Sequence, residues 1–514
     1  MGFPRASGIL LHPTSLPGRY GIGDLGAEAR AFADFLAEAG QTLWQVLPLG
    51  PTGYGDSPYQ CFSSLAGNSL LVSPDLLVED GLLERHDLED APRFSVDRVE
   101  FGEVIKFKHR LLRRACENFK RTAPVALRAE FATFRKNESA WLEDYALFRA
   151  LKDERGGASW NAWDREIARR EANALKAACE RLREETNAHE FYQFLFFRQW
   201  AALKDYCRAK RIKIIGDIPV FVAYDSADVW VNRTLFKLNE DGSPRVMAGV
   251  PPDYFSATGQ LWGNPLYDWE RKQQEVVAWW IERIRATLRL VDVVRMDHFR
   301  GFAASWEIPA GDETAVHGRW IESPGRELFA AIRRELGELP IIAEDLGVIT
   351  PDVDALRDEF GFPGMRILQF AFGSDAESRD LPHNYRANVV VYTGTHDNDT
   401  TVGWFNSVTG HDSTRDAAQV ERERKYCLDY LDTDGAEINW DFIRAALASV
   451  ADTSIIPLQD VLGLDGRARM NLPASTAGNW SWRFERGSLT QDVSARLREL
   501  TELYGRKSKA RGGS

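Results

Sequence analysis

Residues 293–299 read Val-Val-Arg-Met-Asp-His-Phe, a short β-branched run that leads into an ionisable side chain. Two further segments repeat the pattern: Ile-Ile-Ala-Glu-Asp-Leu-Gly at 341–347 and Val-Val-Val-Tyr-Thr-Gly-Thr-His-Asp at 389–397. Continuous apolar character with a charged end is typical of parallel barrel strands whose C-terminal ends carry chemistry. About 50 residues separate consecutive acidic positions, which leaves room for one or two strand–helix units in each gap. The segments therefore predict three strands of one parallel sheet.

Five other strand-like runs bring the number to eight; they lie at 8–12, 42–49, 213–220, 365–372 and 454–459. Helical patterns fill the gaps, most clearly at 27–39, 273–290 and 352–360. Eight strands that alternate with helices predict an α/β fold of the (β/α)8 TIM barrel type. The alternative is a doubly wound open sheet, which more often has a glycine-rich phosphate turn after its first strand. No such turn follows His12.

The uneven spacing of these runs predicts a single catalytic barrel over residues 1–514 with large insertions between its strands. The first insertion covers about 50–211, between strands two and three, and is mostly helical. A second covers about 223–290, after strand three, and contains a stiff turn-rich loop at 249–255; a third covers about 300–340, after strand four. Because no linker rich in Pro, Gly or Ser isolates the helical segment, we interpret it as an insertion and not as a separate domain.

Composition excludes several classes of function. With 64 Lys and Arg against 76 Asp and Glu, the net charge is −12, and a surface this acidic repels a phosphate backbone. Five cysteines without paired-ligand spacing fit a reduced, cytoplasmic protein. No apolar run approaches the length of a membrane span, so no membrane partner is expected. The only basic cluster, Arg506, Lys507, Lys509 and Arg511, is interpreted as a frayed, solvated tail.

Three carboxylates at one mouth of a barrel indicate glycosidic bond chemistry, in which one carboxylate attacks and another transfers a proton. Arg295 and Asp297 are two positions apart, so in a strand they share a face, and the guanidinium would keep the carboxylate ionised. Partial burial of Glu344 would raise its pKa enough for it to act as an acid. The competing interpretations are structural: an ion pair for Arg295 and a helix-capping role for each acidic residue.

His396 and Asp397 fit either sugar hydroxyls or a hard cation; without a loop of alternating acidic ligands we discount a metal. Asp217, at the end of the third strand, either orients its neighbours or closes a buried turn.

Turn-rich loops also carry aromatic residues. Their rings suit the apolar face of a pyranose, but rings in such loops also pack the loop onto the barrel. These residues are Tyr54, Tyr59, Tyr254, Phe255, Trp262, Trp480 and Trp482.

The chain resembles the amylomaltases, the 4-α-glucanotransferases of glycoside hydrolase family 77 in the α-amylase clan. The resemblance runs nearly from end to end. It rests on these segments: His-Pro-Thr-Ser-Leu-Pro at 12–17, Gly-Tyr-Gly-Asp-Ser-Pro-Tyr-Gln at 53–60, Gly-Asp-Ile-Pro at 216–219, Gly-Val-Pro-Pro-Asp-Tyr-Phe at 249–255, Leu-Trp-Gly-Asn-Pro-Leu-Tyr at 261–267, Arg-Met-Asp-His-Phe-Arg-Gly at 295–301, Ala-Glu-Asp-Leu-Gly at 343–347, Thr-His-Asp-Asn at 395–398 and Arg-Met-Asn at 469–471. Many long matches in the same order make this resemblance specific.

The resemblance implies roles position by position. Asp297 would be the nucleophile that forms a covalent glycosyl-enzyme, Glu344 the general acid and then base, and Asp397 a ligand of sugar hydroxyls that stabilises the transition state. Substrate-binding roles would fall to Tyr54, Ser57, Tyr59, Asp217, Asp253, Tyr254, Trp262, Arg295, His396 and Asn471. No cofactor and no metal are implied.

The expected function is that of a retaining 4-α-glucanotransferase, which moves α-1,4-glucan segments from a donor to a glucose or maltooligosaccharide acceptor; cyclic glucans are a further expected product. The alternative is an α-glucan hydrolase or debranching enzyme that uses the same carboxylates. A non-catalytic glucan-binding protein is disfavoured because Asp297 and Glu344 are both present.

Overall fold

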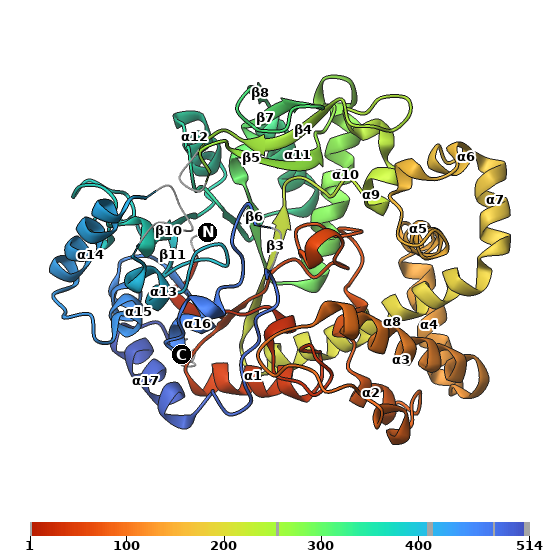
Figure 1. Cartoon of the computed structure of the whole chain (residues 1–514), viewed down its shortest axis with the longest axis horizontal. Helices are drawn as coiled ribbons and strands as arrows, with labels where there is room; N and C mark the ends of the chain where they lie inside the picture. The colour runs from red at the N-terminus through yellow and green to blue at the C-terminus, as the bar shows by residue number, and fades with distance from the viewer. Residues whose placement is uncertain (1–2, 253–255, 409–414, 476–477, 508–514) are drawn as a thin grey trace.

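The computed structural model describes residues 3–252, 256–408, 415–475 and 478–507. At its centre lies an eight-stranded sheet in which every paired strand runs parallel to its neighbour (Figure 1). In sheet order, the strands are β10 (Gly364–Ile367), β11 (Val389–Tyr392), β12 (Thr453–Pro457), β1 (Ala6–Leu10), β2 (Leu43–Gln45), β3 (Lys213–Pro219), β6 (Val293–Asp297) and β9 (Ile341–Ala343).

Hydrogen bonds next to the two edge strands bring the ends of the sheet together. The Ala343 N–H donates to the Pro363 carbonyl at 2.9 Å, and the Met365 N–H donates to Asp345 Oδ1 at 2.7 Å. Each of the eight predicted runs overlaps one of the strands, and β1, β10 and β12 begin one or two residues before the predicted start. The (β/α)8 prediction is therefore confirmed, and the doubly wound open sheet is wrong.

Helices surround the barrel because their apolar stripes pack onto its outer face (Figure 1). The predicted helix at 27–39 is α1, which buries Phe32, Phe35 and Leu36; the helix predicted to start at 273 begins four residues earlier. The helices outside the first insertion are α1 (Ala27–Glu38), α9 (Ala227–Val231), α10 (Trp269–Leu290), α11 (Gly325–Leu336), α12 (Pro351–Glu359), α13 (Thr401–Asn406), α14 (Ala417–Leu431), α15 (Ile438–Ala448), α16 (Leu458–Val461) and α17 (Gln491–Leu503). No helix among the described residues is both long and apolar enough to cross a membrane.

The segment between β2 and β3 forms a helical lobe beside the barrel, on the right in Figure 1. Its helices are α2 (Pro74–Glu79), α3 (Phe101–Thr122), α4 (Val125–Asn137), α5 (Leu142–Glu154), α6 (Arg165–Ala168), α7 (Ala172–Arg181) and α8 (Arg183–Ala209). One continuous cluster of buried side chains runs from the strands into this lobe, from Ile214 and Trp44 to Phe148 and Phe191. Because the lobe shares its main core with the barrel, we propose that the chain is a single barrel with insertions.

A second, four-stranded sheet was not predicted. Its antiparallel strands are β5 (Gln260–Pro265), β4 (Val246–Val250), β7 (Ala304–Pro309) and β8 (Arg319–Glu322), in that order. It joins two segments that the sequence presents as separate insertions, about 223–290 and about 300–340. Strand β4 reads Val-Met-Ala-Gly-Val, without the alternation that marks a two-sided strand, which is why its pairing was not visible.

The prediction of a solvated basic tail is wrong for Arg506. This side chain is fully buried, and its guanidinium donates to the carbonyls of Ala6, Leu447 and Ala451. Leu447 lies in the last turn of α15, and the C-terminal end of a helix is a favourable place for a cation. Burial lowers its pKa to about 9. Residues 508–514 lie outside the described residues.

Candidate active site

The predicted chemical residues gather at the C-terminal ends of three adjacent strands. Asp217 of β3 lies opposite Arg295 of β6 in register, and Asp297 is the last residue of β6. Glu344 follows β9 directly. Because parallel strands in a barrel end at the same mouth, these side chains meet even though about 130 residues separate the first from the last.

Asp397 does not end a strand, contrary to the prediction. Strand β11 stops at Tyr392, and Asp397 lies in the loop that follows. Asn398 shapes this loop, because its Oδ1 accepts hydrogen bonds from the N–H and the hydroxyl of Thr395, at 2.9 and 2.8 Å. Such local side-chain bonds compete with strand pairing.

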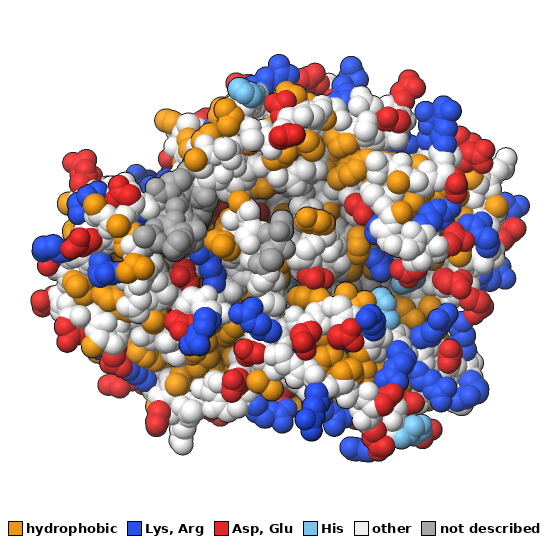
Figure 2. Space-filling model, viewed as in Figure 1, with side chains coloured by type: hydrophobic (Ala, Val, Ile, Leu, Met, Phe, Trp, Pro, Cys, Tyr) orange, Lys and Arg blue, Asp and Glu red, His pale blue; other side chains and the backbone are white. Residues whose placement is uncertain are grey.

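A cavity of about 840 Å3 opens over this mouth, and Figure 2 shows the hollow near the centre of the face. Ten of the predicted site residues line it: Tyr54, Ser57, Tyr59, Trp262, Arg295, Asp297, Glu344, His396, Asp397 and Asn471. Asp217 lies behind this wall, where its Oδ2 accepts a hydrogen bond from the Tyr59 hydroxyl at 2.9 Å. Asp253, Tyr254 and Phe255 lie outside the described residues.

Arg295 bridges two carboxylates. Its Nη1 lies 2.9 and 2.7 Å from the two Asp217 oxygens and 2.9 Å from Asp297 Oδ1. Burial alone would lower the pKa of Arg295, but the charges of Asp217 and Asp297 outweigh it and raise that pKa well above its ordinary value. The guanidinium therefore stays positive beside Asp297 and stabilises its charged form. Asp217 in turn holds Arg295 in place.

Glu344 is 9% exposed and accepts two backbone hydrogen bonds, from the N–H of His298 at 2.6 Å and from that of Leu346 at 2.9 Å. Burial raises its pKa to about 8; Arg295 offsets part of this shift, and Asp297 adds to it. A carboxyl group with this pKa is protonated at neutral pH, whereas Asp297 lies 2.9 Å from the positive guanidinium of Arg295. One cavity thus holds an acid and a nucleophile.

His298 was missed as a functional residue. It has left-handed backbone angles (φ 51°, ψ 54°), which are uncommon for a residue with a side chain and are often found at functional sites. This conformation aims its N–H at Glu344, and its ring lies edge-on to Trp262 at 4.9 Å. The only sequence signal was its place directly after Asp297.

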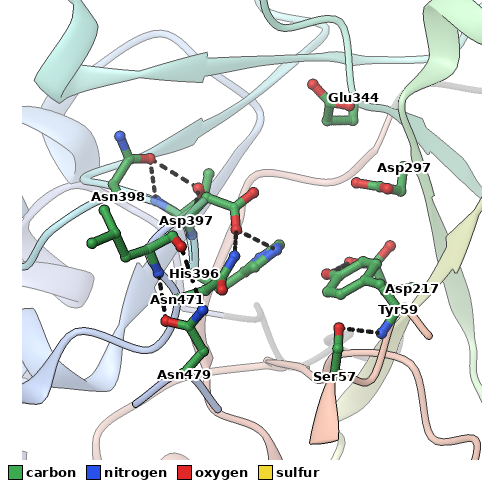
Figure 3. A network of polar contacts seen from close by, with 12 residues as sticks. Ser57, Tyr59, Asp217, Asp297, Glu344, His396, Asp397, Asn398, Asn471 and Asn479 are labelled. Carbon is green, nitrogen blue, oxygen red and sulfur yellow. Dashed lines mark hydrogen bonds and ion pairs between the residues drawn. The ribbon is translucent and has the colours of Figure 1, made fainter. Parts of the chain in front are cut away.

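Asp397 is held across the cavity from Glu344 and Asp297, as Figure 3 shows. Asn471 Nδ2 donates to Asp397 Oδ1 at 2.6 Å, and His396 Nε2 lies 3.4 Å from the same oxygen. Two residues that position Asp397 and Asn471 were not predicted from the sequence. Arg469 donates to the Asp397 carbonyl at 2.6 Å, and Asn479 Oδ1 accepts from the Leu472 N–H at 2.9 Å, which fixes the loop that carries Asn471.

Aromatic rings line the space between the carboxylates. Tyr59 stacks on His396 with ring centroids 5.0 Å apart and 16° between the planes, and its N–H donates to Ser57 Oγ at 3.2 Å. Tyr54 is 80% exposed at the rim. Trp480 also lines the cavity, whereas Trp482 is buried outside its lining. Flat apolar surfaces beside polar side chains are suited to sugar rings.

Among the described residues, no cluster of three or more His, Cys, Asp or Glu has an arrangement that could hold a metal ion.

Comparison with known proteins places these observations in a family. A family model described as 4-alpha-glucanotransferase matches residues 11–490. Two proteins named 4-alpha-glucanotransferase, from Synechocystis sp. and Thermus thermophilus, are each 52% identical to this chain over 98% of its length, and the matches cover 98% and 100% of those proteins.

Two solved structures are also similar to this chain. An amylomaltase from Streptococcus agalactiae in complex with acarbose is 40% identical and superposes with a TM-score of 0.93 over 98% of this chain and 100% of its own. An amylomaltase from Corynebacterium glutamicum, at 20% identity, has the same fold, with a TM-score of 0.78 over 98% of this chain and 74% of its own.

Proposed function

The chain belongs to the 4-alpha-glucanotransferase family, glycoside hydrolase family 77, and from that premise we propose that it transfers α-1,4-glucan segments with retention at the anomeric carbon. The donors are maltooligosaccharides or chains derived from starch and glycogen, and the acceptors are glucose or maltooligosaccharides. The observation that carries the proposal is the pair of unlike carboxyl groups in one cavity, Asp297 beside a guanidinium and Glu344 with a pKa of about 8.

In the first step, an Asp297 oxygen attacks C1 of the donor while Glu344 gives its proton to the glycosidic oxygen, so that the leaving glucan departs as an alcohol. In the second step, the ionised Glu344 removes the proton from the 4-hydroxyl of an acceptor, whose oxygen displaces Asp297 from C1. Two inversions give retention, and Glu344 ends protonated. Asp397, His396 and Asn471 bind hydroxyls of the donor sugar, and Tyr59 supports its ring.

Val250 and Pro251, in the loop at 249–255, line the cavity. The loop at 249–255 has two adjacent prolines, Pro251 and Pro252, and Trp262 lines the cavity beside it. We propose that Asp253 and Tyr254 help to shield the glycosyl-enzyme from water until an acceptor arrives. Long donors could then close on themselves and yield cyclic glucans.

Maltotriose supplied alone is expected to yield glucose and a ladder of longer maltooligosaccharides, with little gain in reducing ends. Transfer conserves the number of glycosidic bonds, whereas hydrolysis consumes them. Chromatographic sizing and a reducing-end assay on the same samples provide the test. A steady rise in reducing ends without longer products would contradict the transferase proposal and favour the hydrolase.

The pH profile of kcat/KM is expected to fall on the alkaline side with an apparent pKa of about 8, that of Glu344. Below this pH, Glu344 is protonated and can donate to the leaving oxygen; above it, the proton is lost and glycosylation slows about tenfold per pH unit. Initial rates with maltotriose at low concentration measure this limb, because kcat/KM reports the free enzyme. An alkaline limb near about pH 5 instead would contradict the assignment of Glu344 as the acid.

A further inference from the structure

Arg300 lines the cavity three residues after Asp297, and the steps proposed above do not use it. The residue is 6% exposed, and among the residues that the structure describes its side chain makes one hydrogen bond, from Nη1 to Thr350 Oγ1 at 2.8 Å. Within the described part of the chain, Nε has no hydrogen-bond partner. Nη1 is paired, but Nε is buried without a partner in this part of the chain, and leaving a buried donor unpaired is costly. The arrangement points to a ligand from the cavity.

Trp320 of β8 fixes the plane of this guanidinium. Arg300 Cζ lies 3.8 Å from the centroid of the indole, close enough for a strong cation–π contact. Trp306 of β7 packs against Trp320 with centroids 5.1 Å apart. Trp320 lines the cavity, and Trp306 is not part of its lining. The four-stranded sheet thus holds the donors of Arg300 in a fixed orientation, which lowers the entropy lost on binding.

Backbone contacts place Arg300 on the Glu344 side of the cavity. The Phe299 N–H donates to the Glu344 carbonyl at 3.0 Å, and Thr350, the partner of Arg300, lies at the end of the loop that begins with Glu344. Asp397 and Asn471 lie across the cavity (Figure 3). Glu344 must reach the glycosidic oxygen, so the wall beside it faces the leaving sugar and later the acceptor.

We propose that Arg300, held flat by Trp320, binds hydroxyl groups of a glucose unit on the acceptor side of the reacting bond. This inference rests on the transferase function proposed above. Neighbouring sugar hydroxyls present lone pairs that a planar pair of N–H groups can match. Water at C1 gains nothing from Arg300, whereas an acceptor sugar does. The residue therefore helps to decide how well a sugar competes with water for the glycosyl-enzyme.

Maltosyl fluoride as donor and maltose as acceptor isolate this step, because the fluoride leaving group brings no sugar to the acceptor side. The KM for maltose in transfer, and the ratio of transfer to hydrolysis, are measured for the wild type, Arg300→Lys and Trp320→Leu. Arg300→Lys keeps the charge but loses the planar fork, and we expect the maltose KM to rise about tenfold. Trp320→Leu removes the support, and we expect a rise of about threefold.

Arg333→Lys is the matched control, since Arg333 also lies over an aromatic ring, Phe360 at 5.0 Å, but is not part of the cavity lining. It should keep the wild-type maltose KM. A folded Arg300→Lys enzyme with an unchanged maltose KM and transfer ratio would overturn the inference. If Arg300→Lys fails to fold by circular dichroism, Trp320→Leu decides by the same criterion. A wild type that forms no transfer products would instead contradict the transferase proposal itself.

Discussion

Replacing Asp297 with Asn is expected to lower the turnover of maltotriose by roughly 10⁴-fold or more while the fold stays intact. An amide is a poor nucleophile, so the covalent glycosyl-enzyme cannot form. The fold should persist because Arg295 keeps its two contacts with Asp217, at 2.9 and 2.7 Å, and because Asp297 is 27% exposed at the mouth and not packed in the core.

Asp205→Asn is a suitable control for this experiment. Its carboxylate lies 68% exposed on α8, next to Arg208 at 3.0 Å, so the same chemical change should alter neither activity nor melting temperature measurably. Melting curves and maltotriose kinetics are compared for both variants. Turnover of Asp297→Asn near the wild-type level, after mass spectrometry has excluded deamidation back to Asp, would remove Asp297 from the nucleophile role.

The barrel could be predicted because its strands are buried on both faces. The strands of the central sheet are short and mostly apolar and do not alternate with polar residues, and that pattern depends only on local sequence. The second sheet could not be predicted, since β4 lacks alternation and pairs with β7 across about 50 residues of intervening chain. Pairing at such a distance is a tertiary property that no local pattern records.

Part of the active site could likewise be predicted from the sequence, and part could not. Arg295 and Asp297 could be placed on one face because a strand has a period of two, and their contact at 2.9 Å agrees with this. Other features of the site depend on how loops fold against one another. They are the position of Asp397 in a loop, the left-handed conformation of His298 and the contact of the Arg300 guanidinium with Trp320. Arg506 was misjudged for the same reason: a terminal position suggests exposure, but the carbonyls that bind it come from other parts of the chain.

Glu344→Gln is expected to separate the two chemical steps. With maltotriose, whose leaving group needs a proton, turnover should fall by roughly 10³-fold, because an amide cannot donate as a carboxylic acid does. With maltosyl fluoride, whose leaving group needs little acid help, Asp297 should still attack C1 and expel fluoride. No base then activates the acceptor, so the glycosyl-enzyme should accumulate.

Glutamine nevertheless changes the local hydrogen bonds. Glu344 accepts from the N–H groups of His298 and Leu346, and an amide has only one oxygen to offer, so one of these donors loses its partner. The cost is about 1–3 kcal/mol. A fall in melting temperature of roughly a few degrees is therefore expected. It does not by itself account for a roughly 10³-fold loss of turnover if the assay is run at a temperature at which the variant is fully folded.

Intact-mass analysis of Glu344→Gln after brief exposure to maltosyl fluoride, followed by acid quenching, measures the adduct directly. The expected gain is one maltosyl group per chain, and peptide mapping should locate it on Asp297. The double variant Asp297→Asn, Glu344→Gln should gain nothing, because it lacks the nucleophile. If the single variant forms no adduct, or if the double variant forms one, the proposed roles of Asp297 as nucleophile and Glu344 as acid and base are contradicted. Since one carboxyl group lies beside a guanidinium and the other is buried with a pKa of about 8, the two variants should fail in different steps of the same reaction.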